Sequence, residues 1–147
     1  MNLQKFNLIM EKSKDYTVFR EFQATSSPDD AYELAKVFQL HQQPEEVFAV
    51  AGFDIQGKPT SYFEVHRGTL SQSVVGVKEI FKRLIVANAH SFIAFHNHPS
   101  GIAVPSPADI EVTKELKKVS KILEIDLLDH IIVGDDAFYS FTENRKL

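Results

Sequence analysis

The chain has 147 residues, the size of one ordinary domain, and its 44% apolar and 24% charged residues are near the average for a soluble globular protein. Its formal net charge of -4 argues against a protein whose main task is holding nucleic acid, which needs a basic face, although a local patch for DNA contact stays open. The absence of cysteine excludes disulfides, thiolate zinc sites and cysteine nucleophiles, so any metal must be held by imidazole and carboxylate.

The N-terminal part of the chain carries no targeting signal that we recognise. Residues 1–6 lack the long apolar run of a signal peptide, and no stretch approaches the roughly 20 apolar residues of a membrane helix. We therefore expect a cytoplasmic protein without membrane contact. Residues 16–22 are rich in β-branched and aromatic side chains, which predicts a strand. We assign residues 1–26 to an N-terminal strand segment and residues 27–147 to one domain.

The first predicted helix begins at a capping sequence. Ser27 can cap it, Pro28 suits the first helical position, and the two acids that follow favour the positive end of the helix dipole. Apolar residues follow at helical spacing, and we expect the helix to end near Leu40, before Pro44.

The middle of the chain predicts a hairpin followed by a helix. Residues 46–53 are mostly apolar and indicate a buried strand, residues 56–59 make a turn, and residues 62–66 form the return strand. Apolar residues then repeat at helical spacing over about 76–89.

The last third alternates strands with a long helix. Residues 91–95 predict another buried strand, residues 107–124 a helix, residues 127–133 a strand and residues 138–141 a final extended segment. The inward candidates on the long helix are Ile110, Leu116, Val119 and Leu123. Because hairpins and long helical crossovers occur together, the sequence predicts an α/β or α+β fold with a mixed central sheet between helices.

A metal site is predicted where the buried strand 91–95 ends. Side chains two apart on a strand point to the same face, so His96 and His98 can direct both imidazoles at one ion. Asp109 follows eleven positions after His98, and the loop is long enough to return its carboxylate to the same point. Two imidazoles and one carboxylate leave a fourth position open, which is typical of a catalytic zinc whose bound water has a pKa of about 7.

A structural interpretation of the same residues stays open. One His-x-His is a weak signal, because histidines are common in loops. Ser106 and Pro107 also make a good helix start, and Asp109 fits a variant of the capping box. The two interpretations do not compete fully, since a capped helix can still present Asp109 to a metal. A His-Asn-His nuclease is a poor match, because that motif spreads its residues over a longer segment.

At these residues the sequence resembles the JAMM (MPN-plus) metalloprotease superfamily. The superfamily pattern is a remote Glu, His-x-His, seven residues, a Ser, two residues and an Asp, and residues 99–105 fill the gap here. Within the superfamily the chain is similar to the bacterial RadC branch from about residue 27 onward. The segments that match the branch are 68–70, 96–101, 105–106, 128–134 and 140–141. The resemblance implies a cytidine-deaminase-like JAB/MPN architecture.

The resemblance also implies residue roles. His96, His98 and Asp109 would be ligands of Zn2+, and Ser106 would help stabilise the oxyanion of a tetrahedral intermediate. The remote Glu would be the general acid/base, and Glu46 fits best, because the family places this residue just before an apolar core strand.

The chain offers further candidates for this site. Glu79 is the rival for the acid/base, but it lies on a predicted helix and is more typical of a surface or ion-pair residue. Glu45 should face away from Glu46 if the strand has begun there. Asp129 and His130 mark the branch; they could orient a ligand from outside the metal shell or form a structural pair.

The function that follows is a zinc-dependent metallohydrolase of peptidase or isopeptidase type, acting on an unknown protein or peptide. The alternatives are a non-catalytic RadC-like interaction domain and a DNA-repair accessory. Longer RadC proteins carry an N-terminal helix-hairpin-helix module, and we expect it to be absent here, which weakens the DNA-repair role and direct nucleic-acid binding. The oligomeric state stays open, with a homodimer among the options.

Overall fold

The structure is a computed structural model, and it describes residues 25–69 and 75–147. The strand predicted at 16–22 lies outside the described residues, so the division at residue 26 stays a prediction. The helices are α1 (Pro28–Val37), the short 3-10 helix η2 (Leu40–Gln42), α2 (Val77–Val86) and α3 (Pro107–Leu123). The strands are β1 (Val47–Phe53), β2 (Pro59–Arg67), β3 (Ser91–Asn97), β4 (Asp126–Val133) and β5 (Phe138–Ser140).

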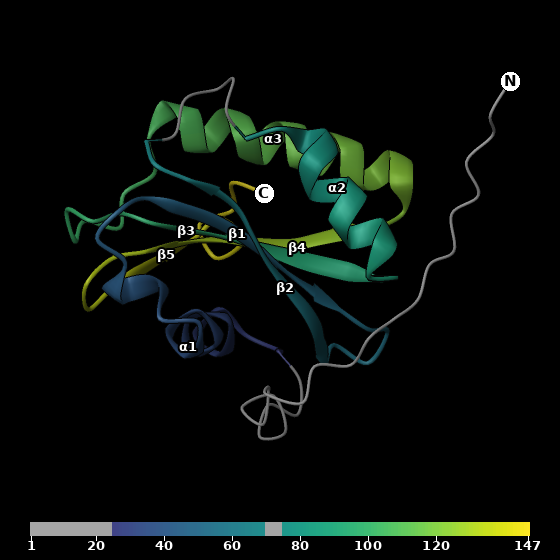
Figure 1. Cartoon of the computed structure of the whole chain (residues 1–147), viewed down its shortest axis with the longest axis horizontal. Helices are drawn as coiled ribbons and strands as arrows, with labels where there is room; N and C mark the ends of the chain where they lie inside the picture. Colours follow the sequence, from purple (N-terminus) through teal and green to yellow (C-terminus); the bar gives the residue numbers. More distant parts are fainter. Residues whose placement is uncertain (1–24, 70–74) are drawn as a thin grey trace, which may run out of the picture.

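The described strands form one mixed sheet in the order β2-β1-β3-β4-β5. Strand β1 is antiparallel to β2 and β3, β3 and β4 are parallel, and β5 is antiparallel to β4. Helix α3 makes the crossover that a parallel pair requires. Figure 1 shows α2 and α3 over one face of the sheet and α1 on the other. The predicted mixed sheet between helices is therefore confirmed.

Strands β1 and β3 are buried on both faces, because each face of the sheet has its own core. Every residue of these two strands is buried, which explains their continuous apolar sequences. Alternate side chains divide between the cores: Phe92 and Ala94 belong to the core under α2 and α3, whereas Ile93 and Phe95 belong to the core next to α1. On β3, even-numbered residues therefore face α2 and α3, and odd-numbered residues face α1.

Helices α1 and α3 begin as the sequence predicts. Ser27 and Ser106 are the N-caps, each followed by proline, and each forms a reciprocal capping box with an Asp three residues later. Helix α1 ends at Val37, earlier than expected, because Gln39 adopts a left-handed backbone conformation with φ of 57°. None of the described helices has the length and apolar character needed to cross a bilayer.

The inward face of α3 differs in part from the prediction. Leu116 is buried and Val119 packs against the core, as expected. Ile110 and Leu123 were assigned wrongly, since they are 38% and 40% exposed. The helix is rotated so that polar side chains in its first turns face the sheet; the buried residues are Asp109, Val112, Thr113, Leu116 and Ser120.

Candidate metal centre

The end of β3 and the start of α3 bring three candidate ligands together. His96 is the second-last residue of β3 and is 1% exposed, and His98 follows the strand directly. Asp109 lies in the first turn of α3 and is also 1% exposed. One ligand atom from each of the three residues can be chosen so that all lie within 4.8 Å of one another. These residues could therefore hold a metal ion.

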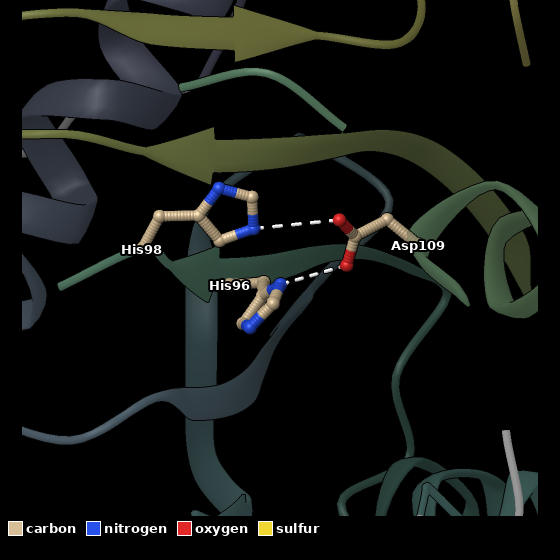
Figure 2. Close-up of side chains that lie close together, drawn as sticks. All are labelled: His96, His98 and Asp109. Carbon is tan, nitrogen blue, oxygen red and sulfur yellow. Dashed lines mark hydrogen bonds and ion pairs between the residues drawn. The ribbon is translucent and has the colours of Figure 1, made fainter. Parts of the chain in front are cut away.

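The two imidazoles approach different oxygens of the same carboxylate (Figure 2). Nδ1 of His96 lies 2.8 Å from Oδ1 of Asp109, and Nε2 of His98 lies 3.4 Å from its Oδ2. The carboxylate therefore contacts both rings, one with each oxygen.

Two further observations fit a metal ion. Nδ1 of His98 donates to the main-chain carbonyl of Ile102 at 2.9 Å, which leaves Nε2 with a lone pair for a ligand bond and fixes the ring orientation. Nε2 of His96 is buried and has no hydrogen-bond partner among the described residues, so an ion would supply one. Two imidazole nitrogens and a carboxylate oxygen form a donor set that suits zinc.

The local electrostatics keep the carboxylate ionised. Burial on its own would raise the pKa of Asp109, but hydrogen bonds from the two histidines and from the Ser106 N–H hold that pKa well below its usual range. The hydrogen bond to Asp109 in turn raises the pKa of His98. Asp109 is thus an anion near neutral pH, which is the form that binds a cation.

Ser106 serves the helix and the site together. Its Oγ accepts the Asp109 N–H at 3.2 Å and donates to Oδ2 of Asp109 at 2.8 Å, and its own N–H donates to the same oxygen at 2.6 Å. Oδ2 of Asp109 accepts the hydrogen bonds of the cap and also faces His98, while Oδ1 faces His96. The capping interpretation and the metal interpretation are therefore compatible.

An open cleft of about 610 Å³ lies beside these residues, and Glu46 lines it. Oε2 of Glu46 lies 4.0 Å from Nε2 of His96, and the Glu46 side chain is 30% exposed. The remaining lining residues are Pro44, Glu45, Gly68, Thr69, His98, Pro99, Ser100 and Ser106. Leu70, which follows two of them in the matched segment 68–70, lies outside the described residues.

The two other candidate glutamates, Glu45 and Glu79, lie in different surroundings. Glu45 lines the same cleft, because β1 begins only at Val47 and strand alternation does not apply at residue 45. Glu79 lies on α2 and pairs with Lys82 at 2.6 Å and Arg83 at 3.0 Å, and these hydrogen bonds lower its pKa. It does not line the cleft, so its ion-pair interpretation is confirmed.

Two buried polar residues lie behind Asp109: His130, for which the sequence left an orienting and a structural role open, and Thr113, which sequence reasoning missed. Oγ1 of Thr113 donates to the main-chain carbonyl of Asp109 at 2.6 Å and lies 2.7 Å from Nδ1 of His130. His130 is fully buried, and burial together with the nearby His96 lowers its pKa to about 3. The imidazole is therefore neutral.

Asp129 and His130 do not act as one pair. The Asp129 carboxylate turns to the C-terminal side, where it accepts from the hydroxyl of Ser140 at 2.5 Å and the N–H of Thr142 at 3.0 Å. Only His130 reaches toward the candidate metal centre, through Thr113. The main-chain N–H of His130 does donate to Oδ1 of Asp129 at 2.7 Å, but the two side chains point to different parts of the fold.

Known proteins resemble this chain along most of its length. The family model of the RadC-like JAB domain matches residues 25–147. A UPF0758 protein of Pseudomonas syringae pv. tomato is 42% identical over 71% of this chain and 47% of its own length. UPF0758 proteins of Roseiflexus castenholzii and Clostridium perfringens are 38% and 39% identical, over 80% and 83% of this chain and 50% and 53% of their own lengths. The chain thus spans about half the length of these curated relatives, whose names state no activity.

Proposed function

The chain belongs to the RadC-like JAB domain family, and from this premise we propose that it is a zinc-dependent hydrolase of amide bonds in a protein or peptide, of peptidase or isopeptidase type. The observation that carries the proposal is the convergence of His96, His98 and Asp109 beside Glu46 at one open cleft. The three polar groups would bind the ion, and the carboxylate of Glu46 lies next to it without being needed as a ligand.

The chemistry divides between the ion and the chain. Zinc in a site with an open position supplies an activated water near neutral pH and polarises a carbonyl group. Glu46 takes up a proton and returns it to the leaving amine, for which its partial exposure and its 4.0 Å separation from the His96 ring are suitable. The cleft of about 610 Å³ leaves room for an extended substrate chain.

Ser106 would stabilise the negative charge that develops on the substrate oxygen. Its hydroxyl lines the cleft, but its proton is donated to Oδ2 of Asp109. The hydroxyl must therefore rotate away from Asp109 to donate to a substrate. Because the Ser106 N–H also donates to Oδ2, the carboxylate keeps a partner while the hydroxyl moves.

The test combines metal analysis with hydrolysis of a peptide library. We expect purified protein to contain about one zinc per chain, as the family site has one ion position, and His98→Ala to lose both the metal and hydrolysis. His90→Ala is the matched control, because His90 lies exposed before the opposite end of β3. Protein that holds no zinc and behaves like His98→Ala would overturn the proposal.

A second pair of variants separates the two neighbouring acids. Glu46→Gln should keep zinc but reduce kcat by roughly 100-fold or more, which is the usual contribution of general acid–base catalysis. Glu45→Gln changes the same chemical group in the same cleft and should leave kcat nearly unchanged. The reverse result would transfer the acid/base role to Glu45.

A further inference from the structure

Asn97, the residue between the two histidines, faces away from the candidate metal centre. It is 2% exposed and lies at the end of β3. Because Ile93 and Phe95 face the core next to α1, alternation places Asn97 on that face and His96 on the opposite one. Asn97 is therefore not a candidate ligand, and its burial needs another explanation.

The Asn97 carboxamide binds the main chain that enters β1. Its Oδ1 accepts the N–H of Val47 at 2.6 Å. Its Nδ2 donates to the carbonyl of Glu45 at 3.0 Å and to that of Gln43 at 3.4 Å. The main-chain ladder between β1 and β3 reaches only the pair Phe48 and His96, so this side chain continues the connection beyond the last rung.

These partners lie on either side of Glu46. The carbonyl of Glu45 belongs to the peptide plane before the Glu46 Cα, and the N–H of Val47 belongs to the plane after it. Since each peptide unit is planar, holding both planes holds the two backbone torsions of Glu46. The N–H of Gly68 adds a bond to the Glu46 carbonyl at 2.8 Å from the β2 side.

The Glu46 side chain lies on the same side of the sheet as the candidate metal centre. Phe48 packs in the core under α2 and α3, and Glu46, which precedes β1, has its carboxylate on that same side. This is the side on which His96 lies, in agreement with the 4.0 Å between Oε2 of Glu46 and Nε2 of His96.

We propose that Asn97 is the positioning residue for Glu46: from the opposite face of the sheet it clamps the two peptide planes flanking Glu46 and so aims the carboxylate at the metal centre. The inference rests on the proposed function for the role of Glu46, while the clamp itself is a property of the fold. It explains why the middle position of His96-Asn97-His98 carries a carboxamide.

Other side chains lack the required groups. The site needs one acceptor and one donor, side by side, on a short side chain. Aspartate would place a second oxygen against two carbonyl oxygens, and leucine would leave buried main-chain groups without partners. Glutamine carries the amide on a longer stem, which the fully packed end of β3 cannot accommodate without displacement.

The first experiment measures the clamp without any substrate. Amide hydrogen exchange is followed by NMR in the zinc-loaded full chain, for wild type, Asn97→Leu and the control Asn144→Leu. Asn144 also donates its amide to a carbonyl, that of Ser140 at 2.8 Å, far along the chain from Glu46. We expect exchange at Val47 and Gly68 to rise about 10-fold or more in Asn97→Leu alone, because leucine offers the Val47 N–H no acceptor, and this is the size of one or two lost hydrogen bonds.

The same samples report on the metal site. The affinity for Zn2+ alone, measured by calorimetry, should change by less than about threefold, because the ligands and their partners are untouched. If Asn97→Leu does not fold, Asn97→Ser provides the measurement with a smaller, polar side chain. Unchanged exchange at Val47 and Gly68 in the folded variant overturns the clamp.

A double-mutant cycle tests the link to Glu46. With the peptide that wild type cleaves best, Asn97→Leu should lower kcat by roughly 10- to 100-fold with KM within about threefold, as for a misplaced catalytic group. In the Glu46→Gln background the same substitution should add almost nothing. Additive losses overturn the positioning role. If wild type cleaves no peptide, the hydrolase proposal fails, and the exchange measurement still decides the clamp.

Discussion

The hydroxyl of Thr113 lies 2.7 Å from Nδ1 of His130, and the direction of this hydrogen bond can be deduced. The single proton of the hydroxyl is donated to the main-chain carbonyl of Asp109 at 2.6 Å. The proton in the other contact must then belong to His130, so the imidazole is neutral with its hydrogen on Nδ1. A chain of two hydrogen bonds therefore joins β4 to the first turn of α3, directly behind a candidate ligand.

Replacing Thr113 by valine tests this connection. Thr113→Val keeps the shape but leaves the buried Nδ1–H of His130 without an acceptor, which should lower the free energy of unfolding by about 1–3 kcal/mol. Because the helix turn that carries Asp109 loses its support, the affinity for Zn2+ should fall by roughly 10-fold or more. Urea unfolding and calorimetric zinc titration measure the two effects.

The control is Thr60→Val, which removes a hydroxyl that donates to the carbonyl of Gly52 at 3.2 Å at the far edge of the sheet. It should cost some stability and leave the zinc affinity unchanged. Equal zinc affinities for Thr113→Val and wild type would contradict a supporting role for the Thr113 contact.

The buried His130 predicts how stability depends on pH. Burial lowers its pKa to about 3, whereas an unfolded histidine has a pKa of about 6.5. Between these values the unfolded chain binds a proton that the folded chain does not. The free energy of unfolding should therefore fall as the pH is lowered below about 6.5, by up to about 1.4 kcal/mol per pH unit from this group.

His130→Asn isolates that contribution, since its amide can still donate to Thr113 but does not titrate. Urea unfolding of metal-free protein at several pH values between 7 and 4 gives the slope for each form. In the variant, the free energy of unfolding should change less steeply with pH, by roughly the 1.4 kcal/mol per pH unit that corresponds to one proton. This holds whatever the stability of the variant at pH 7. Parallel curves for variant and wild type would show that His130 titrates equally in the folded and unfolded chain.

Much of the fold could be predicted because its signals are local. Strands β1 and β3 are buried on both faces, so their apolar runs were unambiguous. The caps Ser27 and Ser106 were recognisable from the proline and acid that follow each within three residues. The inward face of α3 was missed in part, because Thr113 and Asp109 are polar and buried through hydrogen bonds, which hydrophobic spacing cannot detect.

Residue spacing predicted only the three candidate ligands, and Glu46 was expected from the family resemblance alone. His96, His98 and Asp109 fall within one strand and the next helix start, whereas Glu46 lies 50 residues from His96. The pairing of Phe48 with His96 brings it near, and no sequence pattern reveals that register. The contacts of Asn97 with residues 43–47 and of Thr113 with His130 depend on the same long-range pairing.

The two serine caps form a matched pair within one chain. Both Ser27 and Ser106 form capping boxes at the start of a long helix, so replacing either by alanine should lower the free energy of unfolding by about 1 kcal/mol. Only Ser106 also donates to the candidate ligand Asp109 and lines the cleft. Ser106→Ala alone should therefore reduce zinc affinity and hydrolysis, as measured by zinc titration and peptide turnover.

If both alanine variants bind zinc like wild type and cleave peptide at the wild-type rate, Ser106 is a helix cap and nothing more. If Ser27→Ala also weakens zinc binding, general destabilisation explains the effect. Measuring both variants well below their thermal midpoints keeps the comparison to folded protein.

The loop between the metal centre and α3 depends on Gly101. Its φ is +81°, and a Cβ there would collide with the carboxylate of Asp135. Gly101→Ala should cost about 1–3 kcal/mol of backbone strain and shift the loop whose Ile102 carbonyl orients His98. We expect weaker zinc binding, with partial recovery in the Gly101→Ala/Asp135→Ala double variant, because that change removes the collision but not the strained φ.

Gly76→Ala is the control for this glycine, since the nearest atoms to a Cβ there all belong to Glu79 and lie at ordinary contact distance, 3.5 Å at the nearest. Calorimetric zinc titration of the three variants and wild type separates the possibilities. Full recovery in the double variant would assign the whole effect to the collision with Asp135. A Gly101→Ala protein that binds zinc as tightly as wild type would show that the His98 ring is held by its own packing, not by the loop.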